Sequence, residues 1–228
     1  MKIRIAIDGP SGSGKSTLAK NLARELGLVY VDTGALYRSV GLYIKRRGID
    51  PNAGMQVAAV LGEIDLKLSY TEAGQRVILN GEDVSDLIRT NEISMYASAV
   101  SSIPTVRKFL LEIQKKMAIE GNVVMDGRDI GTVIMPDADV KLFLESDAAA
   151  RARRRYEELV AKGQVTSEEE VYSDMIQRDK NDASRETAPL IPAEDAVFID
   201  NSAFTPEETL AHAISIIKEK VKRSVGVN

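Results

Sequence analysis

The chain has 228 residues, of which 44% are hydrophobic and 28% charged, and its formal net charge is -4. This length suits one substantial α/β core with insertions, and the balance argues against disorder. The negative charge excludes a general basic field for nucleic acid, and the absence of cysteine excludes disulfides, thiolate nucleophiles and Cys-ligated zinc. The first ten residues are too polar for a signal peptide or a membrane span, so we expect a cytoplasmic protein.

Apolar runs that resemble buried strands recur along the chain, and stretches with helical periodicity separate most of them. The expected strands cover residues 3–7, 28–31, 123–125, 140–144 and 196–199. The expected helices cover residues 15–26, 34–48, 104–121 and a segment from 205 to the region of 221. Strands that alternate with helices predict a parallel sheet with right-handed crossovers.

Helix ends and faces carry their own signals. Gly27 is typical of a C-terminal cap, and Thr205 followed by Pro206 is typical of a helix start. His212, the single histidine, is expected to be structural or to lie at the surface. The apolar face of the helix over 104–121 is expected to comprise Val106, Leu110, Ile113 and Met117. The inward face of the last helix is expected to comprise Leu210, Ile214, Ile217 and Val221. Residues 166–170 are interpreted as a loop.

Residues 64–79 break the alternation of strands and helices. Apolar and polar residues alternate over 64–70, Glu72-Ala73-Gly74 predicts a turn, and Asn80-Gly81 predicts a second tight turn. These signals indicate an antiparallel hairpin. We interpret it as part of a small subdomain over 62–102, and a hairpin at the edge of the main sheet is the alternative.

A glycine-rich segment matches the pattern G-x-x-x-x-G-K-[ST], directly after a predicted strand and directly before a predicted helix. The segment is Gly9, Pro10, Ser11, Gly12, Ser13, Gly14, Lys15 and Ser16, followed by Thr17. Its glycines let successive backbone N–H groups converge on phosphate oxygens, and the next helix directs its positive end at the same anion. Lys15 would reach the β- and γ-phosphates, and the Ser16 hydroxyl would ligate Mg²⁺.

A phosphate-binding loop alone leaves several classes of protein open. GTPases normally add an Asn-Lys-x-Asp motif, but Lys180-Asn181-Asp182 has the wrong order and a helical context. Large ATPases need a longer chain. The small-molecule kinases remain, and their acceptor site must lie elsewhere in the sequence.

The segment from Asp32 to Arg38 follows the second predicted strand and opens the second helix. In a parallel sheet this position lines the crevice where ligands bind. Thr33 would meet an anion at the helix start, and Arg38, one turn later, would clamp a phosphate. An ordinary helix cap followed by a surface arginine is the alternative.

The segment Asp126-Gly127-Arg128-Asp129 ends a hydrophobic strand. Asp126 suits a carboxylate that organises Mg²⁺-bound water beside the phosphate loop, and Asp32 is a second candidate for this role. Arg128 and Asp129 would lie over the same crevice. A structural ion pair is the alternative interpretation.

Two further groups of arginines have helical spacing. Arg151, Arg154 and Arg155 fall on one face, which predicts a mobile lid that closes over ATP; a solvated face supported by acidic neighbours is the alternative. Arg178, Asp182 and Arg185 also fall on one helical face. Asp182 would accept hydrogen bonds from sugar hydroxyls and the arginines would bind phosphate, although a salt-bridge ladder fits the same spacing.

Over nearly its whole length the chain resembles the bacterial cytidylate kinases, a group of nucleoside monophosphate kinases. The motifs that carry the resemblance are Asp8-Gly-Pro-Ser-Gly-Ser-Gly-Lys-Ser16, Asp32-Thr-Gly-Ala-Leu-Tyr-Arg38, Asp126-Gly-Arg-Asp-Ile-Gly-Thr132, residues 178–185 and Ala188-Pro-Leu-Ile-Pro192. The second and third are specific to the family. Many members have Gly where Ser16 stands, so the resemblance is neutral on Mg²⁺ ligation by that hydroxyl.

The resemblance implies an α/β fold with a five-stranded parallel sheet of the P-loop NTPase type, a small antiparallel nucleotide-binding insert and a helical lid. The implied parts are a core over 1–61, 103–145 and 186–228, an insert over 62–102, and a lid with its following helix over 146–185. Residues 9–17 would bind ATP. The residues implied for CMP binding are Thr33, Tyr37, Arg38, Ser98, Arg107, Arg128, Asp129, Arg178, Asp182 and Arg185. Those implied for catalysis are Lys15, Arg128, Arg185, Arg154 and Arg155.

The implied reaction is transfer of the γ-phosphoryl group of ATP, with Mg²⁺, to CMP or dCMP. The partners would be these nucleotides alone, without nucleic acid or membrane, and family members are usually monomers. Two rivals stay open: a kinase for another acceptor, such as thymidylate, shikimate or dephospho-coenzyme A, and a regulator that uses ATP as a switch. RNA binding is disfavoured because the arginine cluster lacks interleaved aromatic residues.

Overall fold

The computed structural model describes residues 3–71, 74–119, 121–161 and 163–224. The chain forms two compact units, one made of Met1–Val29 with Gly121–Asn228 and the other of Tyr30–Glu120.

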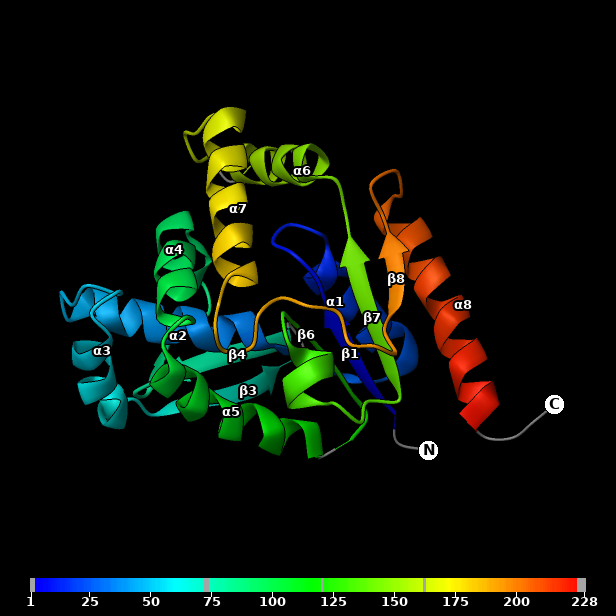
Figure 1. Ribbon diagram of the computed structural model, residues 1–228, viewed down its shortest axis with the longest axis horizontal. Helices are drawn as coiled ribbons and strands as arrows, with labels where there is room; N and C mark the ends of the chain where they lie inside the picture. Colours follow the sequence, from blue (N-terminus) through cyan, green and yellow to red (C-terminus); the bar gives the residue numbers. More distant parts are fainter. Residues whose placement is uncertain (1–2, 72–73, 120, 162, 225–228) are drawn as a thin grey trace. The chain divides into compact units, whose positions relative to one another are not determined.

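The five-stranded sheet has the order β2-β6-β1-β7-β8 (Figure 1). Its strands are β1 (Arg4–Asp8), β2 (Val29–Asp32), β6 (Val123–Gly127), β7 (Val140–Glu145) and β8 (Val197–Asp200). β1 pairs in parallel with β6 and with β7, and β7 pairs in parallel with β8. The predicted parallel sheet is therefore confirmed. In this sheet β1 lies between β6 and β7, which both come much later in the sequence. Open α/β sheets bind ligands beyond the carboxyl end of a strand in such a position.

Helices α1 (Lys15–Leu26) and α8 (Pro206–Ser224) pack against each other; α1 also contacts β6, and α8 contacts β7 and β8. Gly27 ends α1 in the left-handed conformation with φ 63°, as its sequence signal predicts. Thr205 caps α8, because its Oγ1 accepts from the Glu208 N–H at 3.2 Å. His212 is exposed and meets the ring of Phe204 edge-on.

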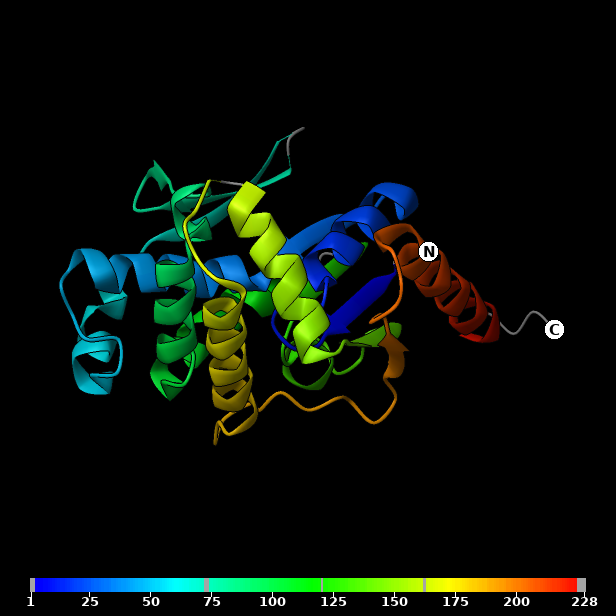
Figure 2. The same ribbon diagram turned by 90° about the horizontal axis from the view of Figure 1, so that it is seen from above.

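Helices α6 (Ala148–Ala161) and α7 (Glu168–Ala183) lie side by side in both views of the ribbon (Figures 1 and 2). The interpretation of residues 166–170 as a loop is wrong in part. Ser167 caps α7, and its hydroxyl and the Glu170 carboxylate each accept the other's backbone N–H in a capping box. A buried cluster formed by Ala152, Leu159, Val171 and Met175 joins the two helices.

The second unit is built on α2 (Thr33–Arg46), which packs along α4 (Asn91–Val100). The two helices approach closely at Gly41, where a Cβ atom would lie 3.0 Å from the Ala97 backbone nitrogen. Its other elements are α3 (Gly54–Val60), α5 (Pro104–Ile119), the short 3₁₀ turns η1 (Leu61–Glu63) and η2 (Leu87–Arg89), and strands β3 (Leu66–Thr71), β4 (Gly74–Leu79) and β5 (Glu82–Asp83).

The predicted hairpin is present: β3 pairs antiparallel with β4, and β5 adds a third strand. Asn80 and Gly81 have φ values of 49° and 85°, the backbone that a tight hairpin turn requires. Residues 72 and 73 of the first predicted turn lie outside the described residues. Inward side chains of the hairpin, including Leu66 and Val77, belong to the same buried cluster as α2.

The expected inward face of the helix over 104–121 is wrong in part. Val106 and Leu110 are fully buried, but Gln114 and Ala118 continue the buried row, while Ile113 and Met117 are half-buried. Each four-residue step turns the row by about 40° around the helix axis, so the buried row winds away from the face that the alternating four- and three-residue spacing predicts. Gln114 is accommodated because its Nε2 donates to the Leu110 carbonyl at 3.1 Å.

Candidate functional site

The glycine-rich loop joins β1 to α1 and has three glycines in backbone conformations that other residues rarely adopt. Gly9, Gly12 and Gly14 have φ values of 148°, 71° and 88°. A Cβ atom at Gly9 would lie 2.3 Å from the Leu144 carbonyl oxygen, so the loop can pass β7 only as glycine. This geometry is the anion-binding loop that the sequence pattern predicts.

Lys15 begins α1 and is buried beneath the loop. Its Nζ donates to the Pro10 carbonyl at 2.5 Å and to the Ser13 Oγ at 3.3 Å. Burial, together with the nearby Arg128 guanidinium, lowers the pKa of Lys15 to about 7, although the neighbouring carboxylates of Asp126 and Asp8 oppose that change. An anion beside Lys15 would stabilise the ammonium form, because opposite charge raises the pKa of a cation.

Ser16 and Asp126 form a pair of hard oxygen donors beside the loop. The Ser16 hydroxyl donates to Asp126 Oδ2 at 2.8 Å, and Asp126 is buried at the end of β6. Such a pair fits Mg²⁺, which typically binds one or two protein oxygens and completes its shell with water and substrate phosphate. No group of three acidic or histidine side chains that could hold a metal occurs among the described residues.

Asp8 fixes the segment that follows β6. Its carboxylate oxygens accept the backbone N–H groups of Ile130 and Gly131, each at 2.8 Å. These residues open a single π-helical turn, Ile130–Ile134, directly after Asp129. Burial raises the pKa of Asp8 to about 6 although both N–H bonds oppose that change.

Asp182 holds two of the predicted phosphate-binding arginines. Arg128 Nε donates to Asp182 Oδ2 at 2.7 Å, and an Arg185 terminal nitrogen lies 3.2 Å from Asp182 Oδ1. Burial opposes ionisation of Asp182, but the guanidiniums of Arg128 and Arg185 outweigh it and lower the pKa of the carboxyl.

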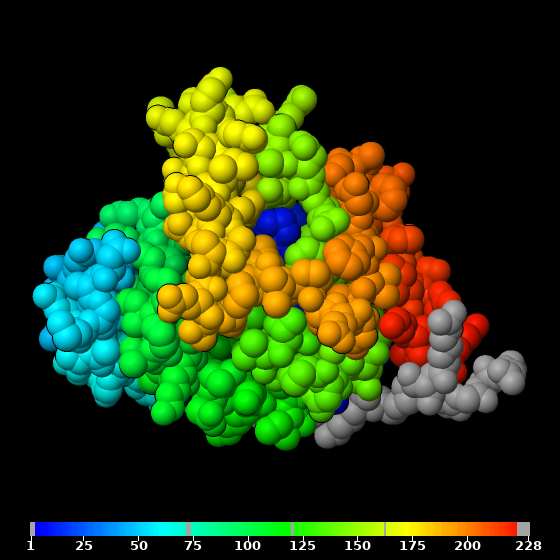
Figure 3. Space-filling model, in the orientation of Figure 1, coloured from blue at the N-terminus to red at the C-terminus, as the bar shows by residue number. Residues whose placement is uncertain are grey.

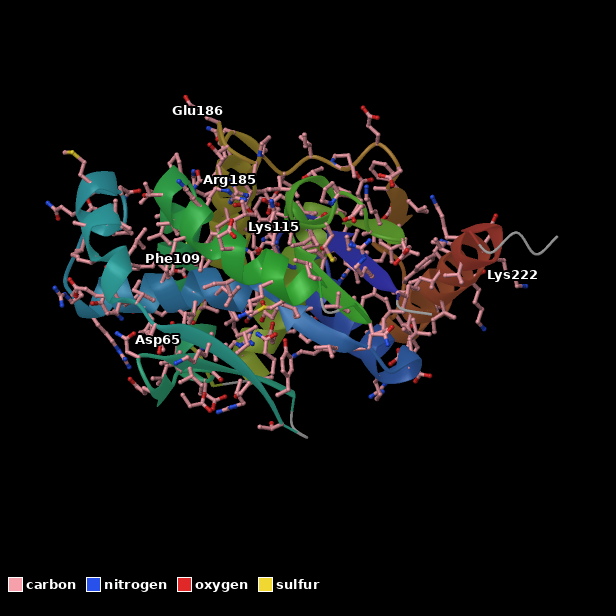
Figure 4. The ribbon with its side chains drawn as sticks, turned by 90° about the horizontal axis from the view of Figure 1, so that it is seen from below. Asp65, Phe109, Lys115, Arg185, Glu186 and Lys222 are labelled. Atoms are coloured by element: carbon pink, nitrogen blue, oxygen red, sulfur yellow. The ribbon has the colours of Figure 1, made fainter. Side chains whose placement is uncertain are left out.

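The expectation that Arg178, Asp182 and Arg185 share one helical face is wrong for Arg185. α7 ends at Ala183, so Arg185 belongs to the chain beyond the helix, where its Nε donates back to the Asp182 carbonyl at 3.2 Å. Arg185 is nevertheless turned inward, whereas the exposed Glu186 lies at the outer edge (Figure 4).

The three arginines expected on the lid have different surroundings. Arg151 is buried and donates to the Ser11 carbonyl at 2.6 Å. Arg154 donates to the Ser146 Oγ at 2.8 Å, and Arg155 pairs with Glu158 of the same helix at 2.8 Å. The solvated-face interpretation therefore does not describe Arg151.

In the second unit, Asp32 caps α2 and organises two arginines. Its Oδ1 accepts the Ala35 N–H at 2.9 Å, and its Oδ2 accepts from Arg38 at 2.8 Å and from Arg89 at 2.7 Å. Burial opposes ionisation, yet both guanidiniums hold the pKa of Asp32 at about 2. Sequence reasoning missed Arg89, because it lies in the short 3₁₀ turn η2 and belongs to no motif.

Other residues implied for the acceptor also lie in this unit. Thr33, the first residue of α2, is buried. Arg107 is buried, with its Cζ 5.6 Å from the Tyr37 ring centre. The Ser98 Oγ is buried and has no hydrogen-bond partner among the residues that the structure describes. A buried hydroxyl without a partner is unfavourable, so Ser98 is a good candidate for a ligand contact.

A cavity of about 480 Å³ adjoins the phosphate loop in the first unit. Its lining residues are Pro10, Phe143, Glu145, Ser146, Asp147, Leu190, Asp200 and Ser202. The space-filling view shows a hollow between α7, the chain that follows it and the end of β7, with part of the N-terminal segment at its bottom (Figure 3). Nothing in the sequence pattern pointed to this cavity, because its residues come from four separate segments.

No helix among the described residues is long and apolar enough to cross a membrane.

Comparisons with known proteins agree with one another. Residues 5–219 match the family model described as cytidylate kinase. The chain is 46% identical to the cytidylate kinase of Carboxydothermus hydrogenoformans over 218 residues, covering 96% of this chain and 98% of that protein. It is 44% identical to the cytidylate kinase of Caldicellulosiruptor bescii over 224 residues, covering 98% and 99%.

Solved structures give the same fold at low sequence identity. A shikimate kinase from Bacteroides thetaiotaomicron matches with a TM-score of 0.50 and 17% identity, covering 96% of this chain and 99% of that one. A gluconokinase from Sinorhizobium meliloti matches with a TM-score of 0.51 and 15% identity, covering 98% and 96%. The chain therefore has the fold of P-loop kinases.

Proposed function

Because the chain belongs to the cytidylate kinase family, we propose that this kinase phosphorylates CMP and dCMP with ATP by direct in-line transfer. The products are CDP or dCDP and ADP. The observation that carries the proposal is the grouping of Lys15, Ser16, Asp126 and Arg128 at the glycine-rich loop. Phosphoryl transfer needs concentrated positive charge and positioning rather than a strong base, and these groups supply both.

The donor is bound by residues 9–17. Backbone N–H groups of the loop bind the phosphates, and Lys15 bridges the outer ones. Ser16 and Asp126 are the residues that would hold Mg²⁺, whose positive charge would neutralise phosphate oxygens. The cavity beside Pro10 has room for the base and sugar of the donor, and the apolar side chains of Phe143 and Leu190 offer it a face.

The residues that we propose to bind the acceptor phosphate are Arg38, Arg128 and Arg185. Arg154 and Arg155 then stabilise the charge of the transferring group. Asp32 and Asp182 hold the acceptor-side arginines in fixed orientations, so little ordering is required when phosphate binds.

The cytosine base is read by Ser98, Arg107 and Asp129. A carboxylate accepts from the exocyclic amine of cytosine, whereas uracil presents a carbonyl there and repels it. Arg178 and Asp182 bind the ribose, and Tyr37 borders the site. The buried Ser98 hydroxyl supports this assignment, because a ligand would satisfy it.

The test is steady-state ADP formation with MgATP against CMP, dCMP, UMP, AMP, GMP and dTMP. We expect kcat/KM to be highest for CMP and dCMP. Asp129→Asn should reduce the preference for CMP over UMP, because the amide can also donate to a carbonyl. Equal turnover with all six acceptors, or none above background, would refute the cytidylate assignment.

A further inference from the structure

Both polar backbone groups of Ser11, in the middle of the phosphate loop, are bound by side chains from the α6–α7 pair. The Ser11 N–H donates to Asp179 Oδ1 at 3.1 Å, and the Ser11 carbonyl accepts from an Arg151 terminal nitrogen at 2.6 Å. The same nitrogen lies 2.6 Å from Asp179 Oδ2. Ser11, Arg151 and Asp179 thus form a closed ring of contacts, the loop clamp.

The loop clamp lies next to Gly12, a residue of the phosphate loop with a left-handed backbone conformation. Gly12 follows Ser11 with φ 71°, and a Cβ atom at Gly12 would lie 2.7 Å from the terminal methyl carbon of Met175. Met175 and Asp179 are one turn apart on α7, so the same face of this helix covers Gly12 and binds Ser11. A glycine-rich loop loses much conformational entropy when it is ordered, and these contacts supply that order before a ligand arrives.

Two roles for Asp179 fit this position, and they predict effects of opposite sign. A carboxylate in an anion-binding loop could compete with phosphate for the loop N–H groups and Lys15. However, Asp179 is already neutralised by Arg151, whose guanidinium is buried and also donates to the Ser146 carbonyl at 3.0 Å. A pair of opposite charges adds little net repulsion, whereas its contacts fix the Ser11 peptide groups.

We propose that Asp179 is a positioning residue which, through Ser11 and Arg151, holds the phosphate loop in its anion-binding shape. This inference rests on the proposed ATP-dependent reaction. It goes beyond it by assigning a role in donor binding to a residue of α7 that is not expected to contact the nucleotide. Acceptor binding should depend on Asp179 only weakly.

The experiment measures the Kd of ATP and of inorganic tripolyphosphate by calorimetry, and the KM for both substrates, in Asp179→Asn and Asp179→Ala. Ser11 and Arg151 contact different carboxylate oxygens of Asp179, and Asn can place an acceptor at only one of these two positions. We expect both ligands to bind about tenfold more weakly to each variant, and the KM for CMP to change less than about twofold. Glu169→Gln, an exposed change of equal charge on the same helix, is the matched control and should leave all four quantities unchanged.

A buried Arg151 without its partner could prevent folding, so a double variant keeps the test decisive. Arg151→Met with Asp179→Leu removes both charges together and leaves no unpaired ion. Because the two side chains act as a unit, the double variant should bind tripolyphosphate no more weakly than Asp179→Ala.

Tighter ATP binding by Asp179→Asn would overturn the proposal and identify the carboxylate as a competitor of phosphate. Unchanged affinity would also overturn it, as would a parallel rise in the KM for CMP. Failure of the unaltered protein to bind ATP would instead refute the proposed function. The two failures can be told apart, because the role of Asp179 is tested only by differences between variants and the unaltered protein.

Discussion

Asp32 and Asp182 are buried carboxylates, and each is bonded to two arginines: Asp32 to Arg38 and Arg89, and Asp182 to Arg128 and Arg185. In both cases the guanidiniums lower the pKa of a carboxyl that burial alone would raise. A guanidinium has five N–H donors, so an arginine paired with aspartate still has donors for phosphate. At the scale of single residues, each unit therefore contains a buried carboxylate that fixes the orientation of two arginines.

The proposed catalytic arginines give the first prediction. Arg128→Ala and Arg185→Ala should each lower kcat by about 10³-fold, because each removes a charge that stabilises the transition state. The check is single-turnover kinetics at saturating ATP and CMP. A decrease below about tenfold in both variants would contradict the assigned roles. Lys222→Ala, an exposed change on α8, serves as the control.

Asp8 gives a prediction on pH. Its pKa is raised by burial to about 6 in the folded state, against 3.8 as the ordinary value. The folded protein therefore holds this proton more tightly than the unfolded chain, and the contribution of Asp8 to stability falls as the pH rises from 3.8 to about 6. The contribution is on the order of 3 kcal/mol and should be absent in Asp8→Asn. Urea unfolding at several pH values measures the slope, and equal slopes in both proteins would refute the prediction.

Helix α7 supplies side chains to both the proposed donor site and the proposed acceptor site. It supplies Asp179 to the loop and Asp182 to Arg128, and it buries Met175 between the loop and α6. Its start is fixed by the capping box of Ser167 and Glu170, and three glutamates occupy its first turn. Negative charge there is favourable, because the N-terminus of a helix carries partial positive charge.

The cap of α7 gives a prediction on stability. Ser167→Ala should lower the free energy of unfolding by about 1 kcal/mol, because the N–H of Glu170 loses its acceptor. Urea denaturation provides the measurement. Ser173→Ala, an exposed serine within the same helix, should change stability by less than about 0.5 kcal/mol. If the two variants were equally stable, the cap would have no energetic role.

On the scale of the whole molecule, the chain folds into two compact units. The first carries the glycine-rich loop, the cavity and the Arg128–Asp182 pair. The second carries Asp32 with its two arginines, and the buried Ser98 hydroxyl. In our proposal the donor is bound by residues 9–17 of the first unit.

Hydrogen exchange measured on the intact protein tests this division. ATP alone should slow amide exchange in residues 9–17 by at least about tenfold, because bound phosphates occupy those N–H groups. CMP alone should slow exchange around Thr33, Ser98 and Asp129. The same protection pattern with both nucleotides would contradict separate donor and acceptor residues. The exposed end of α3 near Met55 should exchange equally in all samples.

The amino-acid sequence alone predicted the five strands of the main sheet, the β3–β4 hairpin, four of the helices and the glycine-rich loop, but not α3 or α4. These features depend on local signals: apolar runs, capping residues, and glycines in a fixed pattern beside Lys15. The family resemblance added residues such as Ser98 and Arg107, which no spacing rule identifies.

Tertiary structure decided which of these charged groups meet. Ser11 is hydrogen-bonded to Asp179, which lies 168 residues away in the sequence. Asp8 is bonded to Ile130, 122 residues away, and Asp32 to Arg89, 57 residues away. Such pairs form because buried polar groups need partners, and the fold alone determines which partners are within reach. For the same reason Arg151 became part of the loop clamp, while Arg155, one turn later on the same helix, pairs with Glu158 at the surface.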